Sequence, residues 1–242
     1  MTSSILKIIA IITMIIDHTG KELFPKELIF TYIGRIAFPI FAFQISEGYI
    51  HTKNLKKYFF RLLIFALVSQ IPFSLFLGVF SDEYCLNIFF TLLLGLLSIY
   101  VYDIIVKRFS TNTILISKLF GNFLGLSIVF TIAYIGNTLN VDYGFFGVFI
   151  IFLFYILKNK KILLTLIFIA SCFLHYLDTL ISTDFYYPNI ILCVCTMIPI
   201  IFINLYNGKQ GNLNKKLKYA FYLVYPVHLL LLYSIYCILN VS

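Results

Sequence analysis

Apolar runs of membrane-spanning length recur along almost the whole chain, and they restrict its fold more than any other feature. A helix needs about 20 mostly apolar residues to cross the hydrocarbon core of a bilayer. The segments that meet or approach this length are 5–24, 28–47, 58–80, 86–106, 114–137, 143–157, 162–177, 186–206 and 217–239. The sixth and seventh are short, so eight or ten spans also fit. We therefore predict an all-α, polytopic helical membrane bundle of about nine transmembrane helices, folded as a single domain over residues 1–242.

The charged residues support this class. Only 12% of the 242 residues are charged and 61% are hydrophobic, whereas about a quarter of the residues in a soluble domain are charged. The 18 Lys and Arg residues outnumber the 10 Asp and Glu residues, but they lie in short gaps between apolar runs, as orientation signals do. We therefore expect no nucleic-acid partner. Asp17 and His18 follow the first run without a small-residue cleavage site, so we expect a retained span rather than a signal peptide.

Basic and acidic residues alternate from one gap to the next. Basic residues follow the second, fourth, sixth and eighth spans: Lys53, Lys56, Lys57 and Arg61; Lys107 and Arg108; Lys158, Lys160 and Lys161; Lys209, Lys215, Lys216 and Lys218. The other gaps carry mainly acids, namely Asp82, Glu83, Asp142, Asp178 and Asp184. Only the first gap is mixed, with Lys21, Glu22, Lys26 and Glu27. The positive-inside rule then predicts a cytoplasmic N-terminus and an external C-terminus.

The five cysteines (Cys85, Cys172, Cys193, Cys195 and Cys237) lie mostly inside apolar runs. The spacing of Cys193 and Cys195 suits no common metal site, and no histidine is near them in the sequence. We expect neither a metal site nor a disulfide.

The stretch IITMIIDHTG, residues 11–20, ends an apolar run on two ionisable side chains. Such groups are costly inside a span and are functional candidates. If the first span ends at Phe24, His18 lies about 9 Å below the outer end of that span. Arg35 lies about 10 Å below the outer end of the second span, so the two residues are at a similar depth. Because successive helical residues point about 100° apart, Asp17 is expected to pair with Arg35 rather than to orient His18. Whether this pair only pins two helices or supports a reactive His18 stays open.

Two other polar features carry similar alternatives. His228 lies near the middle of the last span, two residues after Pro226. A proline opens the helix backbone and makes room for a ligand, although a single histidine in an apolar helix is more often structural. Glu47 and His51 are four residues apart on one helical face, where they either pair at the interface or line a site. We assign no role to Asp103 or His175.

The loop YNGKQGNLNKKLKY, residues 206–219, combines Gly and Asn with four lysines on the predicted cytoplasmic side. Gly and Asn permit tight turns, and Lys supplies point charges suited to phosphate groups. An orientation signal needs only the lysines. The loop therefore indicates either topology alone or a phosphate-bearing ligand.

Seven segments, taken in order, resemble the TraX family, which is named for an F-pilin acetylation protein. The segments are MIIDHTG (14–20), IGRIAFPIFAFQISEGYIHT (33–52), YFFRLLIFALVSQIPF (58–73), LNIFFTLLLG (86–95), DYGFFG (142–147), YNGKQG (206–211) and YAFYLVYPVHLLLL (219–232). The resemblance covers essentially the whole chain. The chain departs from the family at Gln210, where Arg is expected, and this weakens a phosphate-binding role for the loop.

The resemblance implies an acyltransferase of the bacterial cytoplasmic membrane that uses cytosolic acetyl-CoA. The acceptor would be an amine or hydroxyl of a peptide, protein or glycan. On this basis the expected catalytic residues are His18, Asp17 and Arg35. The residues expected to bind acetyl-CoA, including those of the loop, are Arg61, Tyr225, His228, Asn207, Lys209 and Lys215. Glu47, Asn87 and Asp142 are expected to line the substrate.

Acyl transfer needs a base and groups that stabilise an oxyanion. Histidine suits the base role because its ordinary pKa is about 6.5, so we expect His18 to act as the base or as a transient acyl carrier. Two other functions stay open: a transporter that uses the buried ionisable groups as a relay, and an assembly factor without catalysis. Many transporters have broken helices in matched halves, and no such symmetry is visible here. The sequence leaves the acceptor and the oligomeric state open.

Overall fold

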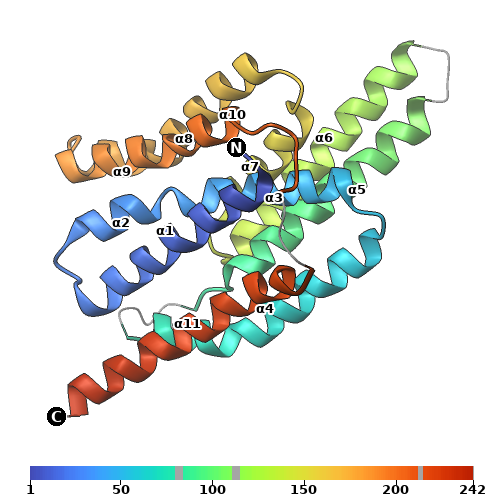
Figure 1. Ribbon diagram of the computed structural model, residues 1–242. Coiled ribbons are helices and arrows are strands. Elements are labelled where there is room, and N and C mark those ends of the chain that lie inside the picture. The colour runs from blue at the N-terminus through green and yellow to red at the C-terminus, as the bar shows by residue number, and fades with distance from the viewer. Residues whose placement is uncertain (80–83, 111–114, 212–214, 242) are drawn as a thin grey trace.

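The computed structural model describes residues 1–79, 84–110, 115–211 and 215–241 (Figure 1), without the side chains of 215–219 and 240–241. The helices are α1 (Ser3–Leu23), α2 (Leu28–Gly34), α3 (Ala37–His51), α4 (Leu55–Leu77), α5 (Ile88–Ser110), α6 (Leu115–Thr138), α7 (Gly144–Ile156), α8 (Lys161–Ser182), α9 (Tyr187–Met197), α10 (Pro199–Asn204) and α11 (Lys215–Val241). Among the described residues, eight segments are long and apolar enough to cross a membrane, when α2–α3 and α9–α10 each count as one. This confirms the predicted polytopic helical bundle.

The short helix α7 completes a further pass. The backbone N–H of Ser3 donates to the carbonyl of Lys209 at 3.0 Å, and that of Ser4 donates to Gln210 at 3.1 Å. The start of α1 and the loop after α10 therefore lie on one side, so an even number of passes connects them. Without a pass through α7, seven passes would connect them. The 13 residues of α7 are few for a span, but eight of them are buried inside the bundle, where no lipid must be matched.

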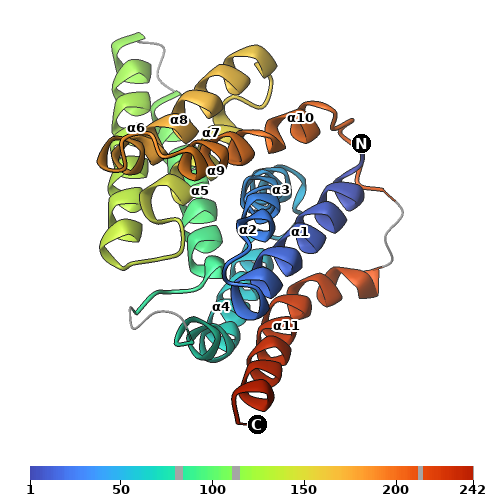
Figure 2. The same cartoon turned by 90° about the vertical axis from the view of Figure 1, so that its left-hand side faces the viewer.

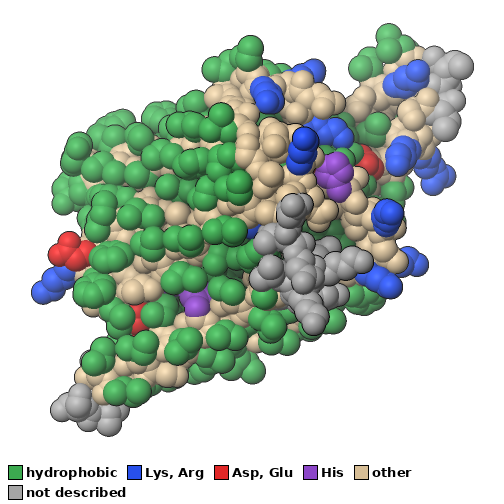
Figure 3. Space-filling view, viewed as in Figure 1, with side chains coloured by type: hydrophobic (Ala, Val, Ile, Leu, Met, Phe, Trp, Pro, Cys, Tyr) green, Lys and Arg blue, Asp and Glu red, His purple; other side chains and the backbone are tan. Residues whose placement is uncertain are grey.

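The positive charges gather at one end of the bundle, which we call the cationic end (Figure 3). Its cations follow α3, end α5, flank the α7–α8 turn and lie in the loop after α10: Lys53, Lys56, Lys57, Lys107, Arg108, Lys158, Lys160, Lys161 and Lys209. A cytoplasmic location for this end stays a prediction. The predicted acidic residues Asp82 and Glu83 lie outside the described part of the chain.

Two spans are broken at a proline. Pro39, the third residue of α3, has no N–H to donate to the carbonyl of Arg35, which favours a break in the helix at that point. The break therefore falls at Arg35 and Ile36, and Ile36 donates to a carbonyl only three residues back. Pro199 begins α10 after a similar break at Ile198. The second-span break puts Arg35 between two short helices rather than along one straight helix.

Helix α7 lies in the middle of the bundle (Figure 2). The helices α1 and α11 lie side by side, with α2–α3 and α4 next to them, while α5 and α6 pack together on α7, and α8–α10 pack on α7 and on α2–α3. Small residues hold α6 close to α5. A Cβ on Gly121 would lie 2.4 Å from Cβ of Phe109, and one on Gly125 would lie 2.8 Å from Tyr102, as expected of a GxxxG contact.

Candidate functional site

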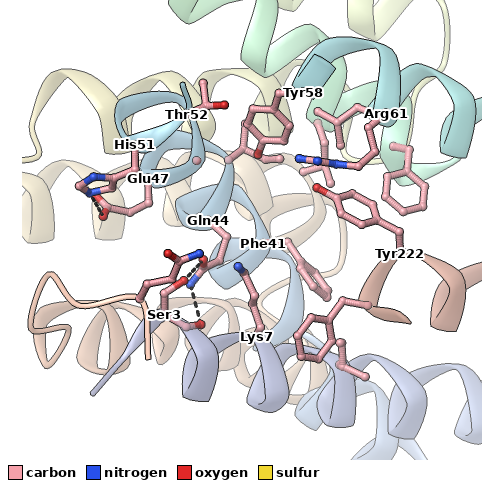
Figure 4. A pocket seen from close by; sticks show the side chains of 18 of the residues that line it. Ser3, Lys7, Phe41, Gln44, Glu47, His51, Thr52, Tyr58, Arg61 and Tyr222 are labelled. Carbon is pink, nitrogen blue, oxygen red and sulfur yellow. Dashed lines mark hydrogen bonds and ion pairs between the residues drawn. The ribbon is translucent and has the colours of Figure 1, made fainter. Parts of the chain in front are cut away.

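A cavity of about 420 Å³ extends from the cationic end into the bundle, between α1, α3, α4, α5 and α11 (Figure 4). This volume is typical of small-molecule sites. Along α1 the wall runs from Ser3 to Met14, about 16 Å at the helical rise. The mouth is polar, whereas the inner end, which we call the floor, is formed by Met14, Ile88, Phe89 and Tyr225.

Arg61 supplies a positive charge to this cavity from α4. Its guanidinium lies between two rings, 5.1 Å from the centroid of Tyr58 and 5.0 Å from that of Tyr222, and its Nε is buried without a hydrogen-bond partner. Lys7 points into the same space from α1 (Figure 4). Stacking on aromatic faces fixes a guanidinium but leaves its N–H edge available for an anion. Arg61 thus lines a cavity, and its contact with acetyl-CoA, expected from the resemblance, stays a prediction.

Polar side chains at the mouth pair with one another. Nε2 of His51 lies 3.3 Å from a carboxylate oxygen of Glu47, which confirms that these two residues pair. Both also line the cavity, so a substrate role for Glu47 stays a prediction. Burial and the neighbouring Glu47 raise the pKa of Tyr206. The hydroxyl of Ser3 donates to the side-chain oxygen of Gln44 at 2.7 Å, closing the mouth between α1 and α3.

Beyond the floor lies a pair of histidines from α1 and α11. Nδ1 of His18 is 2.7 Å from Nε2 of His228, and the two rings are parallel. Nδ1 of His228 is 2.7 Å from the carbonyl oxygen of Val224. A carbonyl only accepts, so Nδ1 of His228 carries a proton and its Nε2 accepts in turn. His18 must then carry its proton on Nδ1, which leaves its Nε2 with a free lone pair.

Aromatic rings hold this pair against the cavity. The ring of His18 lies 5.1 Å from that of Phe76 and 6.3 Å from that of Tyr225, between centroids. The sequence alone placed His18 and His228 in separate parts of the site. A depth count was the missed signal: at 1.5 Å per residue, His18 is about 22 Å from the start of α1, and His228 is about 20 Å from the start of α11.

Asp17 has a different partner from the predicted one. Its carboxylate pairs with Nζ of Lys21 at 2.8 Å, and no bridge to Arg35 forms, so that pairing was wrong. Residues four apart share one helical face, which puts Lys21 nearest. The predicted common level is right, because a Cβ on Gly34 would lie 2.2 Å from Cβ of Asp17. Arg35 still interacts electrostatically with Asp17, Tyr143 and Tyr176.

Asp142 joins these groups from the loop before α7. Its backbone N–H donates to the carbonyl of Leu86 at 2.8 Å. Burial raises the pKa of its carboxyl to about 6, and the electrostatic influence of Lys21 and Arg35 opposes this rise. We call Asp17, Lys21, Arg35 and Asp142 the buried charged cluster. Asp142 is not among the cavity-lining residues, and its contact with a substrate stays a prediction.

Asn87 has a structural position instead of the predicted one in the substrate lining. Its side chain has no exposed surface. Its amide donates to the carbonyl of Ala66 at 2.7 Å and to Gln70 at 2.8 Å, while its oxygen accepts from the backbone N–H of Phe89 at 3.0 Å. Asn87 therefore caps α5 and ties it to α4, with no group left for a substrate.

The loop after α10 contributes backbone more than charge to the mouth. The side-chain oxygen of Asn207 accepts from the backbone N–H of Lys209 at 3.1 Å, and Gly208 has a φ of +74°, so Asn207 shapes a turn that favours glycine. Gly208 and Gln210 line the cavity. Phosphate contacts for Asn207 and Lys209 stay predictions, and the side chain of Lys215 lies outside the described part.

The described residues contain no group of three or more His, Cys, Asp or Glu side chains that could hold a metal ion. The five cysteines are free thiols, of which Cys172 and Cys193 are buried.

Comparison with known proteins places the chain in one family. The family model described as TraX protein matches residues 2–236. The chain is 29% identical, over 95% of its own length and 93% of the other, to a probable fimbrial assembly protein FimC of Dichelobacter nodosus. It is also 29% identical to an uncharacterized protein of Rickettsia prowazekii, over 75% of this chain and 64% of that one. No solved structure matches. A family match over nearly the whole of a multi-pass membrane chain identifies it, and this protein belongs to the TraX family.

Proposed function

We propose that this protein is a membrane-embedded acetyltransferase. It would move an acetyl group from acetyl-CoA to an amine or hydroxyl of a peptide, protein or glycan acceptor, in the bacterial cytoplasmic membrane with its cationic end in the cytoplasm. The observation that carries this proposal is the histidine pair. A histidine whose Nδ1–H is fixed by a partner and whose Nε2 is free is a positioned general base, and it lies just beyond the floor of a ligand-sized cavity.

The cavity fits the donor. Acetyl-CoA joins phosphate groups to a long, mostly apolar arm that ends in a thioester. Arg61 and Lys7 provide the positive charge near the mouth, and the apolar floor provides a dry end for the thioester. Lys209 lies in the loop after α10, between Gly208 and Gln210, which line the cavity. The donor would thus enter from the cationic end with its reactive carbonyl directed at Tyr225 and the histidine pair.

The transfer itself follows from the proton positions. Nε2 of His18 takes the proton of the attacking amine or hydroxyl while the new bond forms to the carbonyl carbon. The C–S bond then breaks, and the same proton passes from Nε2 to the departing sulfur. His228 holds the Nδ1 proton of His18 throughout and stabilises the transient imidazolium. The buried charged cluster fixes α1 against α2 and so sets the position of His18.

The relatives indicate a class of acceptor. The Dichelobacter relative is named a probable fimbrial assembly protein, and the family name refers to pilin acetylation. A surface protein handled at the outer side of the membrane therefore fits best. The buried charged cluster lies on the side of His18 away from the cavity, which suits an acceptor arriving from that side.

A transporter is the second candidate, because the structure adds one observation in its favour. The breaks in α2–α3 and α9–α10 are of the kind that forms substrate sites in many transporters. However, neither α9 nor α10 lines the cavity. The transport reading predicts substrate movement across vesicles without any acetylated product.

The deciding experiment starts with donor binding. We expect the purified full-length protein in lipid nanodiscs to bind acetyl-CoA saturably by calorimetry, and Arg61→Gln to bind it more weakly. Radiolabelled acetyl-CoA should then label proteins or glycans in membranes that contain the protein and leave membranes without it unlabelled. Absence of saturable binding by the wild type would contradict the proposal, whatever the labelling shows.

A further inference from the structure

Tyr225 lies between the cavity and the histidine pair. It lines the floor, its side chain is only 4% exposed, and its ring centroid lies 6.3 Å from that of His18 and 5.7 Å from that of His228. An edge-on contact with Phe89, at 5.3 Å, fixes the plane of the ring. A group bound at the floor therefore meets Tyr225 before it reaches His18.

The hydroxyl of Tyr225 has a proton to give. The backbone amide of Ile88, in the first turn of α5, interacts favourably with the hydroxyl oxygen. A phenol has one proton and can also accept, so this interaction leaves the O–H available. The N-terminal end of a helix also favours nearby negative charge. The hydroxyl is therefore placed and polarised as a donor.

Neighbouring polar side chains are committed to other partners. Asn87 bonds to Ala66 and Gln70, and the hydroxyl of Thr91 donates to the carbonyl of Asp142. The other three residues of the floor are Met14, Ile88 and Phe89, which have no polar side-chain hydrogen. Among these described residues, Tyr225 is the side chain that can donate to a carbonyl oxygen held at the floor.

We propose that Tyr225 is a catalytic residue that stabilises the oxyanion of the tetrahedral intermediate. The inference rests on the proposed acetyl transfer. As the acceptor bonds to the thioester carbon, the carbonyl electron pair moves onto oxygen, and the hydroxyl of Tyr225 donates a hydrogen bond to it without losing its proton. When the C–S bond breaks, the pair returns to the carbonyl. His18 alone carries the transferred proton.

The test removes one oxygen atom. Tyr225→Phe should lower the turnover of acetyl transfer roughly 100- to 1,000-fold, the usual cost of losing one oxyanion donor, and leave the affinity for acetyl-CoA within about twofold. Tyr233→Phe removes a hydroxyl from the same helix away from the cavity and should leave both unchanged. Infrared spectra of bound, carbonyl-labelled acetyl-CoA give a second readout. The wild-type band should shift to lower frequency, and Tyr225→Phe should abolish the shift.

The outcomes separate the two proposals. If wild type binds acetyl-CoA and transfers acetyl groups but Tyr225→Phe keeps full turnover and the same carbonyl band, the role of Tyr225 is wrong and the acetyltransferase stands. If wild type shows no saturable acetyl-CoA binding, both are wrong. A loss of donor affinity equal to the loss of turnover, with an unchanged carbonyl band, would also overturn the inference, because Tyr225 would then only shape the floor.

Discussion

The mouth of the cavity and the histidine pair beyond its floor are built in opposite ways. At the mouth, Glu47 and His51 are neighbours on one helix and partly exposed. Beyond the floor, His18 and His228 are 210 positions apart and meet only because the first and last of the described helices pack together. Loosening one pair of helices should therefore damage chemistry more than binding, whereas changes at the mouth should affect binding alone.

The largest expected difference in turnover is between variants of His18, on α1, and of His51, on α3. His18→Ala should reduce acetyl transfer by about 1,000-fold, within the range attributed to a general base, because no other group takes the acceptor proton. His51→Ala at the mouth is the matched control, and its turnover at saturating acetyl-CoA should equal that of wild type. Labelling of membranes with radiolabelled acetyl-CoA measures both. Retained activity in His18→Ala would remove the distinction between the regions.

His228 sharpens the comparison because its role is positional. His228→Leu removes the acceptor for the Nδ1–H of His18 and should cost roughly 100-fold in turnover, with little change in donor affinity. His228→Gln keeps an acceptor near the position of Nε2 and should recover most of the loss. The pH dependence of turnover should change in the Leu variant and stay close to wild type in the Gln variant. Equal losses in both would point to a merely structural histidine.

Gly34 tests the packing that places His18. An added Cβ would overlap Asp17, so Gly34→Ala should lower the free energy of unfolding by about 1–3 kcal/mol and reduce turnover with it. Gly136→Ala is the control, since its nearest contact would be a side-chain atom 3.3 Å away on the other side of the bundle. The thermal midpoint in detergent reports stability. A stable, fully active Gly34→Ala would show that the α1–α2 contact does not set the site.

Arg61 should give the smallest effect, confined to binding. Losing a charge-assisted contact costs about 1.5 kcal/mol, so Arg61→Gln should weaken acetyl-CoA binding roughly tenfold and leave turnover at saturation unchanged. Arg61→Lys should recover only part of the affinity, because an ammonium cannot stack between Tyr58 and Tyr222 as a guanidinium does. Calorimetry on Arg108→Gln, a cation of the same end outside the cavity, provides the reference. A fall in turnover alone would contradict this assignment.

The fold was largely predictable because its signals are local. The lengths of the apolar runs located the spans, including the extra pass through α7. The alternation of basic and acidic gaps predicted that the basic gaps share one side of the bundle. The break at Arg35 was not foreseen, although Pro39 four residues later removes the N–H that a continuous helix needs. Close helix contacts at glycines, such as that of Gly121 with α5, were also not predicted from the sequence.

The sequence singled out several residues that line or lie near the cavity, such as Arg61, Tyr225 and His18, but not how such side chains pair. Depth counting put Asp17 and Arg35 at one level, but it carries no information about which helical face points where, so Lys21 was missed. The same limit hid the contact of His18 with His228. Asn87 was assigned to the substrate because a buried amide in a span is a functional candidate. Its three partners, Ala66, Gln70 and Phe89, were needed to show that its hydrogen bonds were already used.

The meeting of α1 with α11 also has a consequence for biogenesis. Because half of the histidine pair and the tyrosine of the floor reside on α11, a ribosome that has inserted the first eight passes has made a membrane protein without a working centre. On the proposed mechanism, activity would begin only when α11 docks against α1.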